Sequence, residues 1–478
     1  MDNSFYLNMF HTSVEDMDRI IAAALSGGCN YADLYFENTL YRSLTLKDGT
    51  VASGGVHVDY GVGIRSLCGG KCGYAYCENT DFPDMLKAAK AASSIALYPD
   101  QREWKGFGPS KTSAMEDKAA GLWEMADNRS LMEILELLES KLRARDSRII
   151  KVIGKISGSD SYIMMYNSFG ELRCDSRPMG SLNASIIFSA GQDGPDGASR
   201  TENRSSGLSF RLGPEMFEES MVDQLVDTLC SGIDRCLEAG RPKGGRMPVV
   251  MGAGASGILL HEAMGHAFEA DFNRKGQSIF CDKMGQQVCP KGINIVDDGT
   301  WTDNRGELRY DDEGIAGQKT YMVEDGILTS YLHDRLSASY YGVEPTGNGR
   351  REGFRYPPIP RMRLTYMESG NCCLEDMISS IDKGIYVDEF SNGQVKIGEG
   401  DFTFYVKSGY EIENGRLTRP IKDINVIGNG PQALSDIEMV GADLKIDNST
   451  WTCGKDQSVP VGCGMPSVKV RELTVGGE

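Results

Sequence analysis

The sequence predicts an α+β protein whose two halves differ in secondary structure. Before residue 240, helical spacing of apolar residues alternates with strand-like runs, which indicates an N-terminal α/β half with helices on a mixed sheet. After residue 240, hairpin signals at Asp325-Gly326 and Asn414-Gly415 predict a C-terminal half rich in antiparallel β structure. Because 478 residues exceed what one hydrophobic core serves, we expect three domains. They are an N-terminal α/β domain (1–110), a central α/β domain (111–240) and a β-rich C-terminal domain (241–478).

The first unit should contain two helices and a strand meander. Thr12-Ser13-Val14-Glu15 is a capping box that starts a helix, and Gly27-Gly28 ends it. Strand alternation and then helical spacing follow, and a polar segment closes the unit. These segments are strands at 31–46 and 49–62, a helix at 82–97 and a connection at 99–118.

The second unit repeats this order. Ser130-Leu131-Met132-Glu133 is another capping box, which starts a helix that runs to about Arg145. Four short strands follow, at 149–156, 162–167, 171–175 and 182–189. The later segments are a hairpin or lid at 191–207, a long amphipathic helix at 215–237 and a linker at 239–246.

The third unit begins with a short strand, Pro248 to Met251, that leads into an apolar helix. Two hairpins are predicted downstream, over 320–333 and 402–417, with helical intervals at about 374–383 and 432–440. The third unit therefore carries the helix that contains the histidine motif described below.

Composition excludes several classes of function. A formal net charge of -18 argues against nucleic-acid binding, which depends on lysine and arginine contacts to phosphates. No apolar run approaches the length of a membrane span and the polar N-terminus is unlike a signal peptide, so we expect a cytoplasmic protein without a membrane partner. The 13 cysteines should then be mostly reduced core residues, and strand alternation accounts for Cys68, Cys72 and Cys77.

One basic cluster stands out against the acidic background. Its members are Arg350, Arg351, Arg355, Arg361 and Arg363. Such arginines can hold a substrate carboxylate or acidic residues of a neighbouring subunit. A solvated loop is the simpler interpretation of this loop-rich stretch.

The strongest chemical signal is His261-Glu262 followed by His266 inside an apolar helical run. The pattern differs by one residue from His-Glu-x-x-His, in which two histidines bind zinc and the glutamate handles a water proton. On a regular α-helix, positions five apart point about 140° away from each other, so both imidazoles reach one metal only across a π-type turn. Gly265 would ease such a turn. The alternative is a pair of hydrogen-bonded histidines without a metal.

A catalytic zinc site needs a third protein ligand. By chemistry alone the candidates are Glu269, Asp271, His333, Cys453 and Cys463. Spacing does not choose between them.

Several motifs together resemble the TldD branch of the TldD/PmbA peptidases. They are the stretch from His261 to Arg274, Thr346-Gly-Asn-Gly-Arg-Arg351, Val426-Ile-Gly-Asn-Gly430 and the stretch from Thr452 to Gly462. The resemblance implies a zinc site formed by His261, His266 and Cys453, in the metal-bearing subunit of a homodimer or of a heterodimer with a PmbA-like (TldE) chain. It also implies a cytoplasmic peptidase that cleaves unfolded or small peptides and in some bacteria matures peptide precursors. Two halves closing around a buried active site are the implied fold.

These residues support a hydrolytic mechanism in which Glu262 acts as general base next to the zinc ligands. Arg350 and Arg351 are candidate substrate-binding residues, for a substrate terminus or an acidic leader. Two other functions stay open. One is a non-hydrolytic regulatory or partner subunit with a structural metal, in line with a gyrase-modulator label that the family has carried. The other is a zinc hydrolase of a non-peptide amide.

Overall fold

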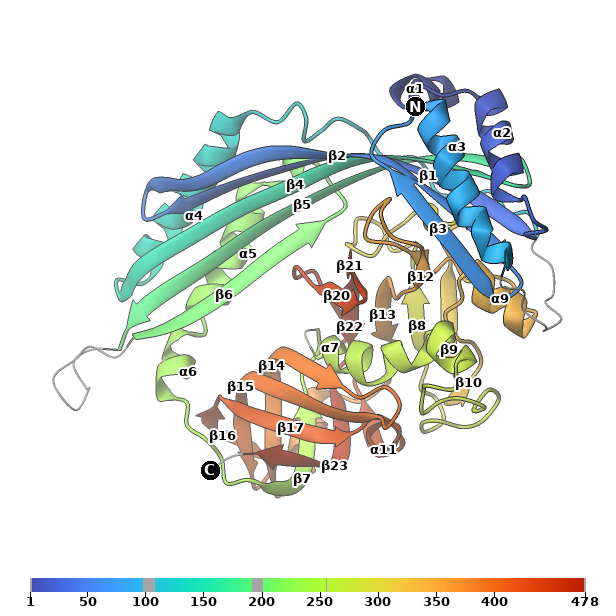
Figure 1. Cartoon of the computed structure of the whole chain (residues 1–478). Helices are drawn as coiled ribbons and strands as arrows, with labels where there is room; N and C mark the ends of the chain where they lie inside the picture. Colours follow the sequence, from blue (N-terminus) through green and yellow to red (C-terminus); the bar gives the residue numbers. More distant parts are fainter. Residues whose placement is uncertain (1, 98–107, 191–200, 255, 477–478) are drawn as a thin grey trace.

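The computed structural model describes residues 2–97, 108–190, 201–254 and 256–476, and it confirms the α+β class. Figure 1 shows a long curved sheet from the N-terminal half that arches over a β-rich C-terminal half. The histidine-bearing helix lies in the C-terminal half, below this arch.

The arch is one six-stranded sheet in the order β3-β2-β1-β4-β5-β6. Its described pairings are all antiparallel, where we expected a mixed sheet. Strands from both expected N-terminal units therefore share one sheet, because β1 pairs with β2 on one side and with β4 on the other. The bounds are β1 Tyr31–Lys47, β2 Thr50–Cys68, β3 Lys71–Cys77, β4 Ile149–Asn167, β5 Leu172–Ser189 and β6 Thr201–Phe210.

The four short strands predicted between 149 and 189 are two long ones, β4 and β5. Gly158 and Gly180 lie between the predicted short strands, and in the continuous strands they serve packing. A Cβ at Gly158 or at Gly180 would overlap the indole ring of Trp123, which lies fully buried against the sheet. Of the expected hairpin or lid at 191–207, residues 191–200 lie outside the described part of the chain, and the rest belongs to β6.

Helices cover one face of the arch. Apolar residues of α1 (Asn3–Met9), α2 (Val14–Ala24) and α3 (Phe82–Ser93) pack on β1, β2 and β4 at one end. At the other end, α4 (Asn128–Arg145) and α5 (Glu219–Cys230) pack on β4 and β5. The 3₁₀ turns η1 (Ser94–Leu97) and η2 (Pro214–Met216) adjoin these helices.

Three helix predictions in the N-terminal half need correction. Helices α2 and α4 begin after Ser13 and Asp127, whose side chains accept from Asp16 N and Ser130 N, and not after Thr12 and Ser130 as the predicted capping boxes imply. The single helix predicted over 215–237 is divided into η2, α5 and α6 (Ile233–Glu238). Gly232 marks the last break, where a Cβ would overlap the guanidinium of Arg204.

Two sheets make up most of the C-terminal half. The larger, seven-stranded sheet follows β14-β7-β23-β17-β15-β16, with β18 beside β23, and a further β14–β15 pairing closes it on itself. Its bounds are β7 Gly245–Met251, β14 Lys383–Val395, β15 Asp401–Glu413, β16 Arg416–Ile421, β17 Ile424–Asn429, β18 Ile437–Val440 and β23 Val468–Gly476. The predicted hairpin at Asn414-Gly415 is the β15–β16 connection.

The second, six-stranded sheet has the order β10-β9-β8-β13-β22-β19, and β9–β10 is the hairpin predicted at Asp325-Gly326. Its bounds are β8 Ile295–Asp298, β9 Lys319–Glu324, β10 Ile327–Leu328, β13 Leu364–Met367, β19 Lys445–Asp447 and β22 Gly462–Met465. Two small ribbons complete the half, β11 (Gly349–Arg350) with β12 (Ile359–Pro360) and β20 (Thr452–Lys455) with β21 (Gln457–Pro460). Outside the histidine motif, the helices of this half are α9 Arg335–Tyr341, α10 Leu374–Ser379 and α11 Gly430–Ser435. The helix predicted at 432–440 is wrong beyond Ser435, because Ile437–Val440 is strand β18.

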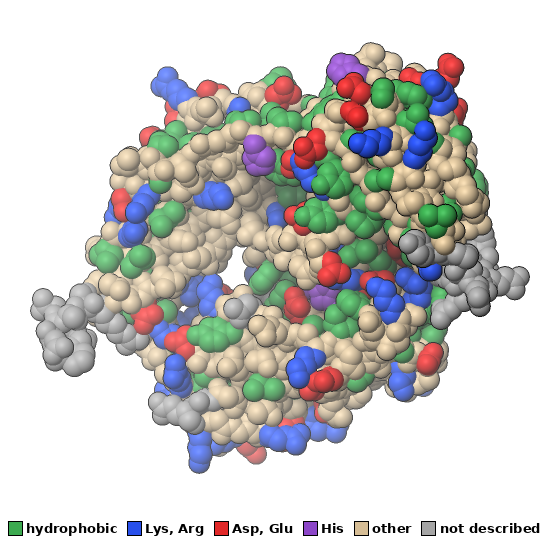
Figure 2. Space-filling model, in the orientation of Figure 1, with side chains coloured by type: hydrophobic (Ala, Val, Ile, Leu, Met, Phe, Trp, Pro, Cys, Tyr) green, Lys and Arg blue, Asp and Glu red, His purple; other side chains and the backbone are tan. Residues whose placement is uncertain are grey.

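The uncovered face of the arch has an apolar end and a polar end. At the apolar end, Tyr35, Ile163 and Met165 pack on Tyr310 and Phe354 of the C-terminal half. At the other end, a hollow of about 460 Å³ is lined mainly by polar residues and glycines of β1, β2, β4 and β5, together with Arg305 of the C-terminal half. Figure 2 shows an opening between the arch and the C-terminal half.

Buried ion pairs join the two halves at one turn, Asp311-Asp312-Glu313. The guanidinium of Arg65, on β2, donates to Glu313 Oε1 at 2.6 Å, and that of Arg177, on β5, donates to Asp312 Oδ1 at 2.5 Å. All four side chains are almost fully buried. Each guanidinium also pairs with a carboxylate of the arch, Arg65 with Asp33 and Arg177 with Asp175, so the two arginines connect the arch to this turn.

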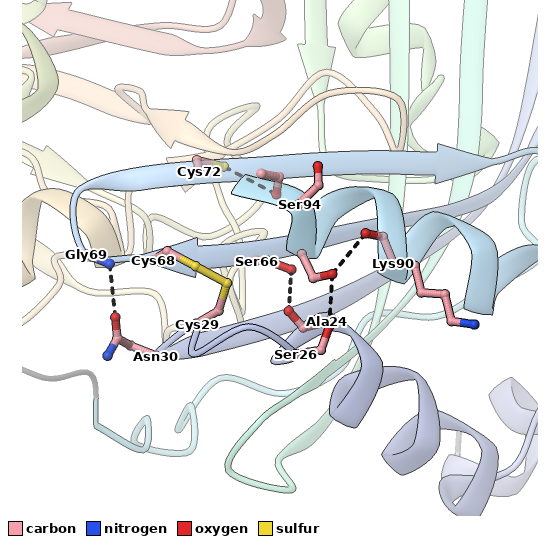
Figure 3. Close-up of a disulfide and its surroundings, with 12 residues drawn as sticks. Ala24, Ser26, Cys29, Asn30, Ser66, Cys68, Gly69, Cys72, Lys90 and Ser94 are labelled. Carbon is pink, nitrogen blue, oxygen red and sulfur yellow. Dashed lines mark hydrogen bonds between the residues drawn. A yellow bond between two sulfur atoms is a disulfide. The ribbon is translucent and has the colours of Figure 1, made fainter. Parts of the chain in front are cut away.

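A disulfide joins Cys29, just before β1, to Cys68 at the end of β2 (Figure 3). Nearby, Gly69 N donates to Asn30 Oδ1 and Ser66 Oγ donates to the carbonyl of Ala24. Most described cysteines are free, as expected, but this pair is not. No helix within the described ranges is long and apolar enough to cross a bilayer.

Candidate metal centre

The histidine motif lies in a helical segment that is mostly buried. It comprises α7 (Gly257–Leu260), the π-helical turn η3 (His261–Gly265), the 3₁₀ turn η4 (His266–Phe268) and α8 (Ala270–Arg274). The apolar residues from Ile258 to Phe268 belong to the largest hydrophobic cluster of the described chain. Gly257 allows the first turn to touch the backbone of Gly464 in β22, where a Cβ would come within 2.6 Å of the Gly464 nitrogen. Both histidines are thus fixed on a rigid, packed element.

The predicted π-type turn is confirmed. His266 N donates to the carbonyl of His261, a bond that spans five residues. The wider turn reduces the angular offset of the two side chains from about 140° to about 50°. Their rings accordingly lie on the same side, with centroids 5.1 Å apart and planes at 83°.

Cys453, on β20, completes the group. One potential ligand atom each from His261, His266 and Cys453 lie within 4.8 Å of one another, and Cys453 Sγ is 3.2 Å from His266 Nε2. A tetrahedral zinc with ordinary Zn–N and Zn–S bonds separates neighbouring ligand atoms by about 3.3–3.6 Å. Of the five third-ligand candidates, the structure therefore brings Cys453 to the two histidines.

The burial of His261 tests whether these residues fit a metal. Its side chain is almost fully buried, and neither ring nitrogen has a hydrogen-bond partner among the described residues. A buried imidazole without partners is costly, and a metal ion would satisfy one of the two nitrogens. The donor set of two imidazoles and one thiol is also one that zinc prefers.

The electrostatics favour a thiolate at Cys453. Burial by itself would raise the pKa of this thiol, but the neighbouring His261 and His266 outweigh burial and hold the pKa well below its usual range. Cys463, on β22, behaves in the opposite way. Burial, with the charges of Asp447 and Glu262, raises its pKa well above the ordinary value, so it remains a protonated packing residue.

Glu269 and Asp271 do not join the ligand group but support it. Glu269 is fully buried, and its Oε2 lies 2.9 Å from His266 Nδ1, which leaves Nε2 of that ring facing Cys453. Although burial opposes ionisation, the charges of Lys455, His266 and Arg361 lower the pKa of Glu269 to about 2. Carboxylates in this position set the tautomer and orientation of metal-binding histidines.

Sequence reasoning missed Lys455 and the contact of Arg361 with Cys453. Lys455 Nζ donates to Glu269 at 3.0 Å and to Asp271 at 2.7 Å, and Arg361 donates to the carbonyl of Cys453. Lys455 follows Cys453 by two residues on one strand, so both side chains leave the same face. This two-residue spacing is the sequence signal that could have identified Lys455.

The other candidates lie elsewhere. His333 is outside the ligand group, and its Nδ1 faces Ser337 Oγ at 3.3 Å. Burial lowers the pKa of His333 to about 4, so it is a neutral core residue. Glu262 is half-buried on the π turn beside His261, and the described residues give it no hydrogen-bond or ion-pair partner.

The solvated-loop interpretation of the arginines is wrong for all of them except the partly exposed Arg355. Arg350 donates to the carbonyl of Met362, and Arg351 donates to the carbonyl of Asp312 and lies over the ring of Tyr35. Arginines of this cluster are buried because they donate to carboxylates and carbonyls of residues 308–313 and 453–457, which are distant in the sequence. Arg350 and Arg351 can read a substrate only if these contacts are released. The buried arginines are Arg350, Arg351, Arg361 and Arg363.

Comparison with known proteins identifies the family. The PmbA/TldA metallopeptidase models match in three parts: domain 1 over residues 32–96, the central domain over 123–231 and the C-terminal domain over 244–477. The chain belongs to the PmbA/TldD metallopeptidase family. Its relatives in this family include a "Metalloprotease TldD homolog" from Buchnera aphidicola, 38% identical over 94% of this chain and 93% of the relative. Another is a "Zinc metalloprotease TldD homolog" from Saccharolobus solfataricus, 29% identical over 96% of this chain and the whole relative.

Solved structures share the fold. A putative modulator of a DNA gyrase from Thermotoga maritima superposes with a TM-score of 0.77 at 22% identity, over 97% of this chain and 99% of that one. TldE from Thermococcus kodakarensis superposes with a TM-score of 0.75 at 17% identity, over 97% of this chain and all of that one. At these identities the likeness establishes the fold alone.

Proposed function

We propose that this chain is a zinc-dependent peptidase that cleaves unfolded or small peptides. The observation that carries the proposal is the convergence of His261, His266 and Cys453 across a π turn that also bears Glu262. Metalloprotease names among relatives that span nearly the whole chain support the same reaction class.

The residues divide the chemistry between them. His261, His266 and Cys453 would hold a zinc ion, which supplies Lewis acidity to the peptide carbonyl and to the attacking water. Glu262 takes the proton of that water and later delivers a proton to the leaving amine. Because Glu262 has no partner among the described residues, its carboxylate is free for this exchange. A structural metal site would need ligands but no adjacent base.

Access favours an extended substrate. The opening in Figure 2 and the polar hollow of about 460 Å³ on the uncovered face of the arch offer room to an extended peptide, whereas the arch would obstruct a folded domain. We further propose a dimer, either with a second copy or with a PmbA-like chain, since TldE shares this fold.

The test is hydrolysis of a casein-type unfolded protein by the purified chain, alone and with a PmbA-like partner. Cleavage should stop with a chelator and return with added zinc. Glu262→Gln should keep about one zinc per chain and the same melting temperature but lose activity by about 100-fold or more. Glu368→Gln, which removes the charge of another partly buried carboxylate, is the control and should stay active.

Two results would redirect the assignment. Zinc binding without peptide cleavage in any combination of chains would favour a structural metal in a regulatory subunit. Full activity of the Glu262→Gln variant would show that some other group activates the water.

A further inference from the structure

The ribbon that carries Cys453 is isolated from the surrounding sheets. Strands β20 and β21 pair only with each other among the described residues. No backbone–backbone hydrogen bond joins residues 452–460 to another described segment. Figure 1 shows this ribbon projecting toward the space beneath the arch. The position of the Cys453 sulfur therefore depends on side-chain contacts.

Arg361 donates to the carbonyls of Cys453 and Gln457, and Lys455 connects the ribbon to the histidine-bearing helix. The ammonium of Lys455 has three donors, and it binds three acceptors: Glu269 Oε2 at 3.0 Å, Asp271 Oδ1 at 2.7 Å and the carbonyl of Pro360 at 3.1 Å. The ammonium also lies 4.2 Å from the ring centre of Phe272. With 6% of its side chain exposed, Lys455 is a buried cation fully matched by its surroundings.

These contacts close a ring through the two imidazole nitrogens of His266. Cys453 faces Nε2, Glu269 faces Nδ1, and Lys455 connects Glu269 back to the strand of Cys453. Such a ring fixes the distance between two ligands that are remote in sequence, because a shift of β20 would have to break a buried ion pair.

We propose that Lys455 is a positioning residue for the metal centre, which holds Cys453 at ligand distance from His266 by pairing with Glu269. This inference rests on the proposed zinc site and assigns Lys455 no contact with substrate. Its role is to keep the third ligand in place before the metal binds, so that ion binding does not have to order the ribbon.

Lys455→Met tests the proposal, with Lys422→Met as the matched control. Lys422 is similarly buried, with 10% of its side chain exposed and an ion pair to Glu202 at 2.9 Å, but it lies on a different part of the fold. Zinc affinity is measured by competition with a chelating dye. We expect Lys455→Met to weaken it by about 10- to 100-fold, the usual effect of losing an outer contact of a metal ligand, and Lys422→Met to leave it unchanged.

A second readout needs neither zinc nor activity. In metal-free protein, alkylation of Cys453 by iodoacetamide, followed by peptide mass spectrometry, reports how firmly the ribbon is held. Cys453 is 2% exposed, so it should react slowly in the parent protein and in Lys422→Met, and faster in Lys455→Met. Lys455→Arg keeps the charge, so Cys453 in this variant should be alkylated faster than in the parent and more slowly than in Lys455→Met. It is the test variant if Lys455→Met folds poorly.

The double variant with Glu269→Gln shows whether Lys455 acts through Glu269. If it does, the loss of affinity in the double variant is smaller than the product of the two single losses. Parent-like zinc affinity and alkylation in Lys455→Met would overturn the proposal. A parent protein that binds no zinc would instead overturn the proposed function, and the alkylation comparison would still decide the role of Lys455.

Discussion

Glu37 should make the stability of this protein fall as the pH approaches neutrality. This β1 residue is 5% exposed, and its carboxylate accepts from Phe354 N at 2.7 Å and from Thr39 Oγ1 at 2.8 Å. Burial, opposed by these two donors, raises the pKa of Glu37 from 4.5 to about 7. The contact with Phe354 links the arch to the C-terminal half, so the titration affects their junction.

The direction and size of this change in unfolding free energy follow from the protonation of Glu37 in the folded and unfolded states. Between about pH 4.5 and pH 7 the folded protein keeps a proton on Glu37 that the unfolded chain has released, so the free energy of unfolding falls as pH rises. A shift of this size corresponds to about 3 kcal/mol, fully present below pH 4.5 and lost once the pH passes 7. Glu37→Gln retains an acceptor for Phe354 N and cannot titrate.

Urea denaturation at pH 5 and pH 8 measures the effect. From pH 5 to pH 8, the unfolding free energy of Glu37→Gln should rise by about 2–3 kcal/mol relative to that of the parent. Glu78→Gln, which changes an exposed partner of Arg355, should show almost no such gain. If the parent and Glu37→Gln lost or gained stability in parallel over this range, the buried-carboxyl argument would be refuted.

Three further predictions concern the site and the junction. Cys453→Ala should lose most of its bound zinc while Cys463→Ala keeps about one per chain, and equal metal contents would reject the ligand assignment. Gly265→Ala should lower stability by about 1–3 kcal/mol in thermal unfolding, because the added methyl overlaps the sulfur of Met362, and an unchanged midpoint would contradict this packing. Asp312→Asn should cost about 1.5–3 kcal/mol in urea, since it removes the charge of one of the two carboxylates, Asp312 and Asp175, that pair with the buried guanidinium of Arg177, whereas a cost below about 1 kcal/mol would mean that water reaches the pair.

The π turn could be predicted from sequence because its cause is local. Two histidines five apart converge only if the helix widens between them, and the structure widens there. Cys453 could not be predicted in this way, because its contact with His266 spans nearly two hundred residues and produces no periodic pattern in the sequence. It came from family resemblance, while chemistry alone left five candidates. Lys455 escaped notice because its role depends on a fold contact with Glu269.

The errors in the fold share one physical origin. Strand limits and the arginine cluster were interpreted from their sequence neighbours, whereas distant residues determine both. Gly158 and Gly180 lie in continuous strands beside Trp123, and Arg351 donates to the carbonyl of Asp312 in a distant acidic turn. The N-terminal sheet turned out to be antiparallel because β1 pairs with β4 directly, a long-range choice that local alternation does not specify.

The central place of β1 has a consequence for synthesis on the ribosome. Once residues 31–68 have emerged, β1 and β2 can form a hairpin, but the other edge of β1 must wait for residues 149–167. Until then, a long strand rich in aromatic and aliphatic residues exposes unpaired amide and carbonyl groups, which is the hazard that leads edge strands to aggregate. We therefore expect nascent chains that stall between these two segments to be the ones that depend most on chaperones.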